Sequence, residues 1–335
     1  MRELENLIEA QPLGTVVSVY KQKALKPFAF VLNVSKLGDS SRVAIAPGHV
    51  LRRATKEEIE FTKVLIKSLF GHHFGHGLWE TQRPKSGTGK YLHLPEKQWR
   101  YFVIEFSSEN ENLELLLEVL AIAPFDLEIG FAVSAATLNA RALSLCVFRP
   151  PRLFQSLSAL QSEVQSEHGT ARIFSEAEGQ KVEVYKKLAA HDHKVLDLRP
   201  ILKLVLELRD LPSFSPLQIL GYFAILESIL THQPNPDDRY DSITRQITQK
   251  LALLNRRWHP ALDYASFGQA TDETIWSKMY AYRSAIAHGT TPDFKSKLSI
   301  LGTADKANTL ISDVVKKTIC HALIEPQLLA DLHNC

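Results

Sequence analysis

The chain has 335 residues, of which 45% are hydrophobic and 23% are charged, as in ordinary globular proteins and unlike disordered ones. With 39 Lys and Arg against 37 Asp and Glu, the net charge of +2 argues against a protein that holds long nucleic acids on a broadly basic surface. The length exceeds what one small helical bundle needs and therefore predicts two domains.

Membrane and secretory signals are missing from the sequence. No apolar run approaches the length of a membrane span, and the first residues lack the basic and then hydrophobic pattern of a signal peptide. Cys146, Cys320 and Cys335 form no close pair, which is typical of reduced thiols and predicts neither a disulfide framework nor a zinc knuckle. We therefore expect a cytoplasmic protein with no membrane contact.

Residues 1–190 are predicted to form an α+β domain with antiparallel strand pairing. A capping box from Thr55 to Glu58 predicts the start of a helix. Further helices are expected at residues 153–164 and 182–188, leading into the second domain. The strand-like runs, rich in Val, Ile, Phe and Tyr, cover residues 15–20, 28–34, 42–46, 101–106, 127–133 and 142–148.

Three motifs in this half do not predict a site. Residues 86–90 resemble a phosphate loop, but Pro84 occupies the first glycine position and Tyr91 replaces the residue that would hold magnesium. His72 and His76 lie in a glycine-flanked loop with few other ligands nearby, so we interpret it as a flexible loop. Residues 191–193 are interpreted as a polar linker. We expect neither a metal nor a cofactor.

Residues 195–335 are predicted to form an all-α bundle. Apolar residues recur at helical spacing within residues 196–209, and Ser215 and Pro216 are a good start for a helix that ends before Gln233. A third amphipathic segment covers residues 243–254 and is followed by a loop over residues 255–269. An aromatic-bearing helix then ends at Gly289, and an apolar stripe at residues 311–323 predicts the closing helix.

The most informative feature is Arg283 followed, after four residues, by His288 at the predicted end of the aromatic-bearing helix. Unsatisfied carbonyls and the negative end of the helix dipole favour an imidazolium there. Arg283 keeps its charge and presents a planar fork of donors suited to phosphate oxygens. The two residue types together could cut a phosphodiester.

The spacing of this pair poses a geometric problem. Five positions at about 100° each place the two side chains about 140° apart around one helix. A single helix therefore does not bring them together. Two copies that meet across a twofold axis can do so, because a self-complementary contact places Arg283 and His288 of one subunit near those of the other.

Residues 282–289, Tyr-Arg-Ser-Ala-Ile-Ala-His-Gly, resemble the signature of HEPN domains, specifically the Apea-like branch, in which Arg is followed after four to six residues by His. The resemblance covers residues 195–332. It implies a small helical bundle that usually dimerises. Many members of the family are metal-independent endoribonucleases, with Arg and His of both protomers in one cleft, and many act in toxin-antitoxin or phage-defence systems.

The resemblance therefore implies an RNA substrate, a homodimer formed through the helical domain, and a phage-derived trigger or an antitoxin as a further partner. In this interpretation the N-terminal domain is a sensor or regulator. Arg283 and His288 are the candidate catalytic residues. Ser284 is added because many family nucleases carry Asn, Asp or His at that position.

Glu227 is a further candidate, because a carboxylate within the apolar run 222–230 is costly unless it is paired. Similar helices in the family often carry an acidic residue there, and we expect it to orient Arg283. The alternative is a carboxylate that reaches solvent at the polar edge of its helix.

Arg256, Arg257, Trp258 and Tyr282 are the candidate RNA-binding residues. The first three lie in the predicted loop, as two cations followed by a ring that could stack on a base. The alternative is a solvated loop with Trp258 in the core. A different function also remains open: a non-catalytic helical dimer that recognises a protein or a nucleotide, which the nearly neutral charge favours slightly.

Overall fold

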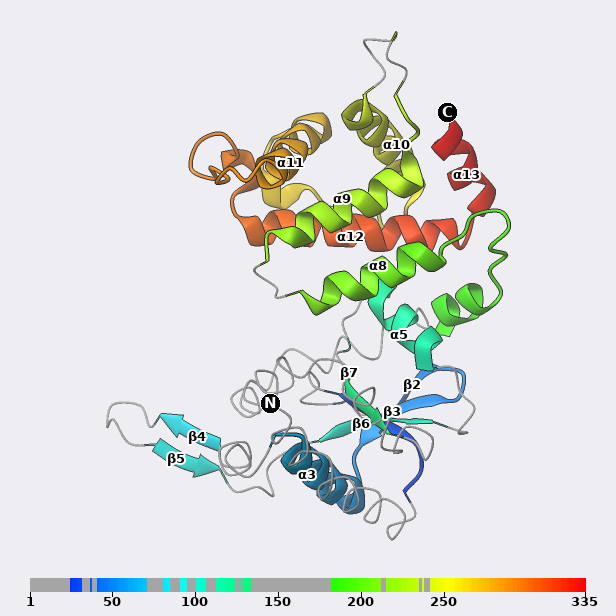
Figure 1. The fold of residues 1–335 in the computed structure, drawn as a ribbon, viewed down its shortest axis with the longest axis vertical. Coiled ribbons are helices and arrows are strands. Elements are labelled where there is room, and N and C mark those ends of the chain that lie inside the picture. Colours follow the sequence, from blue (N-terminus) through cyan, green and yellow to red (C-terminus); the bar gives the residue numbers. More distant parts are fainter. Residues whose placement is uncertain are drawn as a thin grey trace, which may run out of the picture. The chain divides into compact units, whose positions relative to one another are not determined.

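The computed structural model describes residues 25–31, 37, 41–70, 81–84, 91–94, 101–106, 113–123, 127, 129–133, 182–211, 215–234, 237 and 242–335. The chain divides into two units. The first, called here the sheet unit, comprises Met1–Leu113 and Phe125–Val182. The second, the helical unit, comprises Glu114–Pro124 and Glu183–Cys335. Figure 1 labels most of the helices and strands of both units.

The sheet unit contains an antiparallel five-stranded sheet with the order β2-β3-β6-β1-β7. A separate antiparallel pair joins β4 to β5. The expected mixture of antiparallel strands and helix in this half is thus confirmed for the described residues. The strands are β1 (Phe28–Val31), β2 (Arg42–Ala46), β3 (His49–Arg53), β4 (Thr81–Pro84), β5 (Tyr91–Leu94), β6 (Phe102–Phe106) and β7 (Ile129–Val133).

Several sequence predictions can be compared directly with these strands. β2 has the predicted bounds, and β1, β6 and β7 lie within predicted runs. β3, β4 and β5 were not predicted, because β3 ends in two arginines, β4 is polar, and β4 and β5 each have only four residues. The predicted strands at 15–20 and 142–148, the predicted helix at 153–164, and the loops around His72 and at 86–90 lie outside the described residues.

Aromatic packing joins α3 (Lys56–Phe70) to the sheet. Phe61 of α3 meets Phe28 of β1 edge to face, with ring centroids 6.1 Å apart. Phe30 of β1 stacks on Phe131 of the neighbouring strand β7, with ring centroids 5.2 Å apart. These four rings are almost fully buried, so they form the centre of the apolar core of this unit.

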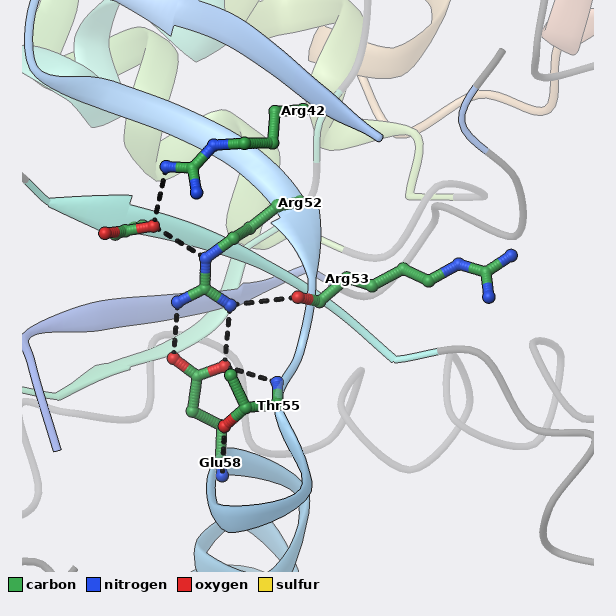
Figure 2. A network of polar contacts seen from close by, with 6 residues as sticks. Arg42, Arg52, Arg53, Thr55 and Glu58 are labelled. Atoms are coloured by element: carbon green, nitrogen blue, oxygen red, sulfur yellow. Dashed lines mark hydrogen bonds and ion pairs between the residues drawn. The ribbon is translucent and has the colours of Figure 1, made fainter. Parts of the chain in front are cut away.

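A polar network joins β2, β3, β6 and the start of α3 (Figure 2). Arg42 and Arg52 lie directly opposite each other on β2 and β3, an arrangement that repels, but Glu105 accepts hydrogen bonds from both at 2.9 and 2.7 Å. Arg52 also donates two hydrogen bonds of 2.8 Å to Glu58. The predicted capping box is confirmed, since Glu58 accepts from the Thr55 amide and the Thr55 hydroxyl accepts from the Glu58 amide.

The helical unit is built from helices packed around one apolar core, including a short helix over residues 182–189 between α5 and α8. Along the described parts of the chain, no helix is long and apolar enough to cross a bilayer. The named helices are α5 (Leu113–Ile122), α8 (Arg199–Asp210), α9 (Leu217–Leu230), α10 (Ile243–Arg257), α11 (Asp272–Ala287), α12 (Ala304–Ala322) and α13 (Pro326–Asn334), with 3₁₀ turns at Ala265–Phe267 and Ser299–Leu301.

α9 is the central helix of this unit and contacts α8, α10, α11, α12 and α13 (Figure 1). Its sequence is apolar on nearly every side, and its exposed residues Leu217, Ala224 and Ser228 share one face of the helix. It ends before Gln233 as predicted, but it begins one residue later than predicted, with Pro216 and not Ser215 as its N-cap. At Gly221, α8 comes so close that an added Cβ would lie 2.1 Å from Cδ2 of Leu208.

α5 belongs to the helical unit although it lies within the first 190 residues, so the predicted division near residue 190 places this helix on the wrong side. Val119, Ala121 and Ile122 are buried in the core that the later helices share. Arg209 of α8 donates a 2.8 Å hydrogen bond to the Leu120 carbonyl. The division failed because these contacts join residues about ninety positions apart, which no local pattern reports.

Replacing Gly221 by Ala is expected to destabilise the helical unit by about 1–3 kcal/mol, because the added methyl group overlaps Leu208. In a Leu208→Ala background the same replacement should instead stabilise by about 1 kcal/mol, since only the gain in helix propensity remains. Native-state hydrogen exchange of peptides from α8 and α9 measures both effects. Equal effects in the two backgrounds would contradict the close contact.

Replacing Arg52 by Met is expected to destabilise the sheet unit by about 3 kcal/mol, because Glu58, whose side chain is 4% exposed, loses its partner. The matched variant Arg42→Met, at a side chain 56% exposed, should cost under about 1 kcal/mol. Hydrogen exchange of β3 and β6 peptides, corrected for intrinsic rates, measures the difference.

The Arg52 effect should also depend on pH. The hydrogen bond from Arg52, and its charge, hold the pKa of Glu105 below its ordinary value. The stability that this depressed pKa contributes is present above the unfolded pKa and is lost as the pH falls through the folded pKa. The difference in free energy of unfolding between wild type and Arg52→Met should therefore become smaller below about pH 4. A difference that becomes larger there would contradict this assignment.

Candidate functional site

α11 carries Arg283 and its C-cap residue is His288. The helix stops before Gly289, as predicted. The amide of Gly289 donates to the Ile286 carbonyl at 3.1 Å, and that of Thr290 donates to the Ala285 carbonyl at 2.8 Å. Gly289 has φ +67, so the two bonds form a Schellman motif with glycine at its left-handed position. The helix therefore stops abruptly at His288, which is its C-cap residue.

His288 is exposed and lies at the negative end of the α11 dipole. Its backbone amide donates to the Ser284 carbonyl at 3.0 Å. Among the described residues, none forms a hydrogen bond or an ion pair with its imidazole. The ring is thus accessible to a ligand from outside this chain.

Arg283 lies against α9, where Glu227 is the one charged residue. Its Nη2 is 3.5 Å from Oε1 of Glu227, and the two side chains are 30% and 21% exposed. Burial raises the pKa of Glu227, and the charge of Arg283 opposes that rise. The expectation that Glu227 faces Arg283 agrees with this geometry, and the alternative of an unpaired carboxylate in solvent does not.

The guanidinium of Arg283 retains its hydrogen-bonding capacity. Within the described part of the chain, no residue accepts a hydrogen bond from it, and its Nε is buried without an acceptor. Its carbon Cζ lies 5.5 Å from the centroid of the Tyr280 ring. Tyr280 in turn meets Phe223 of α9 edge to face, at 5.7 Å and 90°. The cation is therefore held by a ring and a carboxylate.

The structure does not bring all the predicted catalytic side chains together in one chain. Arg283 and Glu227 meet, but no contact joins His288 to either of them among the described residues. Ser284 is half-buried, and its side chain contacts neither functional group. This agrees with the wide angle expected between Arg283 and His288 around one helix.

Two predicted RNA contacts are wrong. Trp258 is 6% exposed and its ring lies in the core, with the Lys317 ammonium 5.9 Å from the ring centroid. Tyr282 is 2% exposed and packs edge to face on Phe294 at 5.1 Å. Neither ring can stack on a base. The reason for Trp258 is visible in its spacing, because α10 runs to Arg257 and Trp258 continues the buried stripe that ends at Leu254.

Arg256 and Arg257 lie in the last turn of α10 and not in a loop. Arg257 forms a 2.7 Å ion pair with Glu325. Arg256 is exposed and lines a cavity of about 240 Å³. The cavity is also lined by Asp272 and Glu273, which disfavour a phosphate. Of the four predicted RNA-binding residues, Arg256 is the one that keeps an accessible, unpaired charge within the described residues.

Tyr280 and Phe223 belong to this site but were not singled out from the sequence. Tyr280 precedes Arg283 by three residues and Phe223 precedes Glu227 by four, so each aromatic shares a helix face with a charged residue. This spacing was the signal in the sequence that could have identified Tyr280 and Phe223 as site residues. That the two faces meet could not be predicted without knowing that α9 packs on α11.

The described residues contain no group of three or more His, Cys, Asp and Glu side chains placed to hold a metal ion. Comparison of the chain with models of protein families, with curated proteins and with solved structures found no match.

Replacing Glu227 by Gln tests how far the charge of Arg283 offsets the cost of burying the Glu227 carboxylate. Because its folded pKa is raised, its contribution to stability is present below the unfolded pKa and is lost as the pH rises through the folded pKa. Relative to wild type, Glu227→Gln should therefore gain stability between pH 4 and pH 7.5, by about 1 kcal/mol or less.

The gain should be larger in an Arg283→Met background, where the opposing cation is gone. Urea unfolding of the four proteins, followed by exchange of α9 and α11 peptides, measures this cycle. A gain that is the same in both backgrounds would show that Arg283 and Glu227 do not interact.

Proposed function

We propose that the helical unit is a HEPN-type endoribonuclease that cleaves RNA without a metal ion. The observation that carries this proposal is Arg283 on α11, contacting Glu227 with its donors unused by the described residues, on the same helix whose C-cap is the exposed His288. A cation with free donors suits a phosphate, and an accessible imidazole suits proton transfer.

In the proposed reaction the ribose 2′-hydroxyl attacks the adjacent phosphorus. The bond from phosphorus to the 2′ oxygen forms while the bond to the 5′ oxygen of the next nucleotide breaks, leaving a cyclic phosphate and a 5′-hydroxyl. One imidazole takes the proton of the 2′-hydroxyl, and the leaving 5′ oxygen receives a proton from the imidazolium that results or from water. Arg283 stabilises the negative charge that accumulates on the phosphoryl oxygens.

The active form is proposed to be a homodimer. In one chain Arg283 and His288 do not converge, and a twofold contact would place Arg283 of one copy near His288 of the other. The near-neutral charge favours a small, local RNA contact. The sheet unit is proposed to sense a trigger or to restrain the site, as in phage defence or a toxin-antitoxin pair.

The alternative function is a non-catalytic dimer that binds a protein or a nucleotide. The acidic pair Asp272 and Glu273 beside Arg256 favours it, because this surface suits a ligand that is not a polyanion. In that case Arg283 and His288 would hold an anion or organise the dimer interface.

The decisive experiment uses the full chain, stripped with a chelator and incubated with labelled RNA. We expect cleavage by wild type, and a loss of about 10²-fold or more in His288→Ala and Arg283→Ala. Matched controls are His259→Ala, an exposed histidine beyond the end of α10, and Lys278→Ala, another cation of α11. An RNA with a 2′-deoxy nucleotide at the cut position should resist cleavage.

The same preparation tests the shared cleft. Co-purified heterodimers of Arg283→Ala and His288→Ala contain one intact Arg and one intact His on different chains, and they should cleave well above either variant alone. Activity that chelation abolishes would reject the proposed chemistry. Wild type and His288→Ala that grow equally well when expressed in bacteria, with no RNA cleaved, would favour the binding module.

A further inference from the structure

Two residue pairs face each other across the contact between α9 and α11. Phe223 and Glu227 are four residues apart on α9, and Tyr280 and Arg283 are three residues apart on α11, so each pair lies on one face of its helix. The aromatic members meet at 5.7 Å and the charged members at 3.5 Å. The link between the two layers is the Arg283 guanidinium, 5.5 Å from the Tyr280 ring centroid.

We propose that Tyr280 is a positioning residue, whose ring, fixed by Phe223, holds the Arg283 guanidinium at the angle needed to receive a phosphate. This inference rests on the proposed nuclease function for its role in the reaction, but not for the placement of the cation. Phe223 is 1% exposed, so its ring has little freedom and limits that of Tyr280.

An arginine can be fixed in one orientation without the use of its donors. A long side chain loses much rotamer freedom when it is ordered, and bidentate hydrogen bonds to a carboxylate are the usual means. Here the contact with Glu227 is an ion pair and no hydrogen bond is formed with the described residues. Attraction to a ring face orders the cation without occupying the N–H groups of its terminal nitrogens, whereas Nε is buried.

A hydrogen-bonded clamp would have the opposite consequence. Each N–H that a carboxylate occupies must be released before a phosphate can bind, which lowers the affinity for the phosphate. With Glu227 supplying charge and Tyr280 supplying a surface, Arg283 is oriented in advance and can contact two phosphoryl oxygens at once.

The first test does not depend on any catalytic activity. In protein labelled with ¹⁵N-arginine, the Arg283 Nε–H signal is identified by its loss in Arg283→Lys. Because this nitrogen is buried near a ring, we expect slow exchange with solvent and a ring-current shift. Tyr280→Leu should remove the shift and speed the exchange about threefold to tenfold, whereas Tyr280→Phe should change neither.

A matched control removes an aromatic contact elsewhere on α11. Phe294 packs on Tyr282, and Phe294→Leu should leave the Arg283 signal unchanged. If Tyr280→Leu fails to fold, Tyr280→Ile is measured in its place. An Arg283 signal that is the same in wild type and in the aliphatic variant would overturn the inference.

The second test measures the role in the reaction. With labelled RNA, the aliphatic variant should lower kcat about threefold to tenfold with KM within about twofold, because the orientation of Arg283 matters most when charge develops. A changed signal with unchanged kcat would overturn the positioning role. If wild type cleaves no RNA, the nuclease proposal fails, and the exchange measurement alone decides whether Tyr280 holds Arg283.

Discussion

The pairing of Glu227 with Arg283 is the interaction on which the architecture of the candidate site depends. α9 is apolar on nearly all sides and is covered by five helices, so a charged residue in it is costly unless a partner comes from a neighbour. α11 supplies that partner as Arg283, whose Nη2 lies 3.5 Å from Oε1 of Glu227. The position of His288 follows, because it is the residue at which the same helix stops.

Local signals predicted the local structure well. The capping box at Thr55, the end of α9 and the stop at Gly289 all depend on residues within one or two turns, so the sequence alone contained them. The expected pairing of Glu227 with Arg283 agrees with their 3.5 Å contact; it rested on the cost of a carboxylate in an apolar run and on the family resemblance. Trp258 was misplaced because its loop was assumed to begin at Asn255, whereas the buried stripe of α10 continues to it.

Contacts distant in sequence could not be predicted in the same way. Nothing near Leu120 indicates that its carbonyl will accept a hydrogen bond from Arg209, or that α5 will join helices that begin some seventy residues later. Likewise, the contact of Phe223 with Tyr280 requires the crossing of α9 and α11, which is set by the packing of the whole bundle. The short sequence motif thus located Arg283 and His288 and missed the ring surface against which Arg283 rests.

The position of α5, between the two segments of the sheet unit, limits how the two units can be separated during gene rearrangement. Val119, Ala121 and Ile122 complete the core of the helical unit, yet they are encoded between segments that build the sheet unit. Gene fusion and exon exchange move continuous segments of a coding sequence. Any continuous segment that contains the whole helical unit also contains β7 of the sheet. The two units are therefore expected to be inherited together, because neither can be moved as a continuous segment without part of the other.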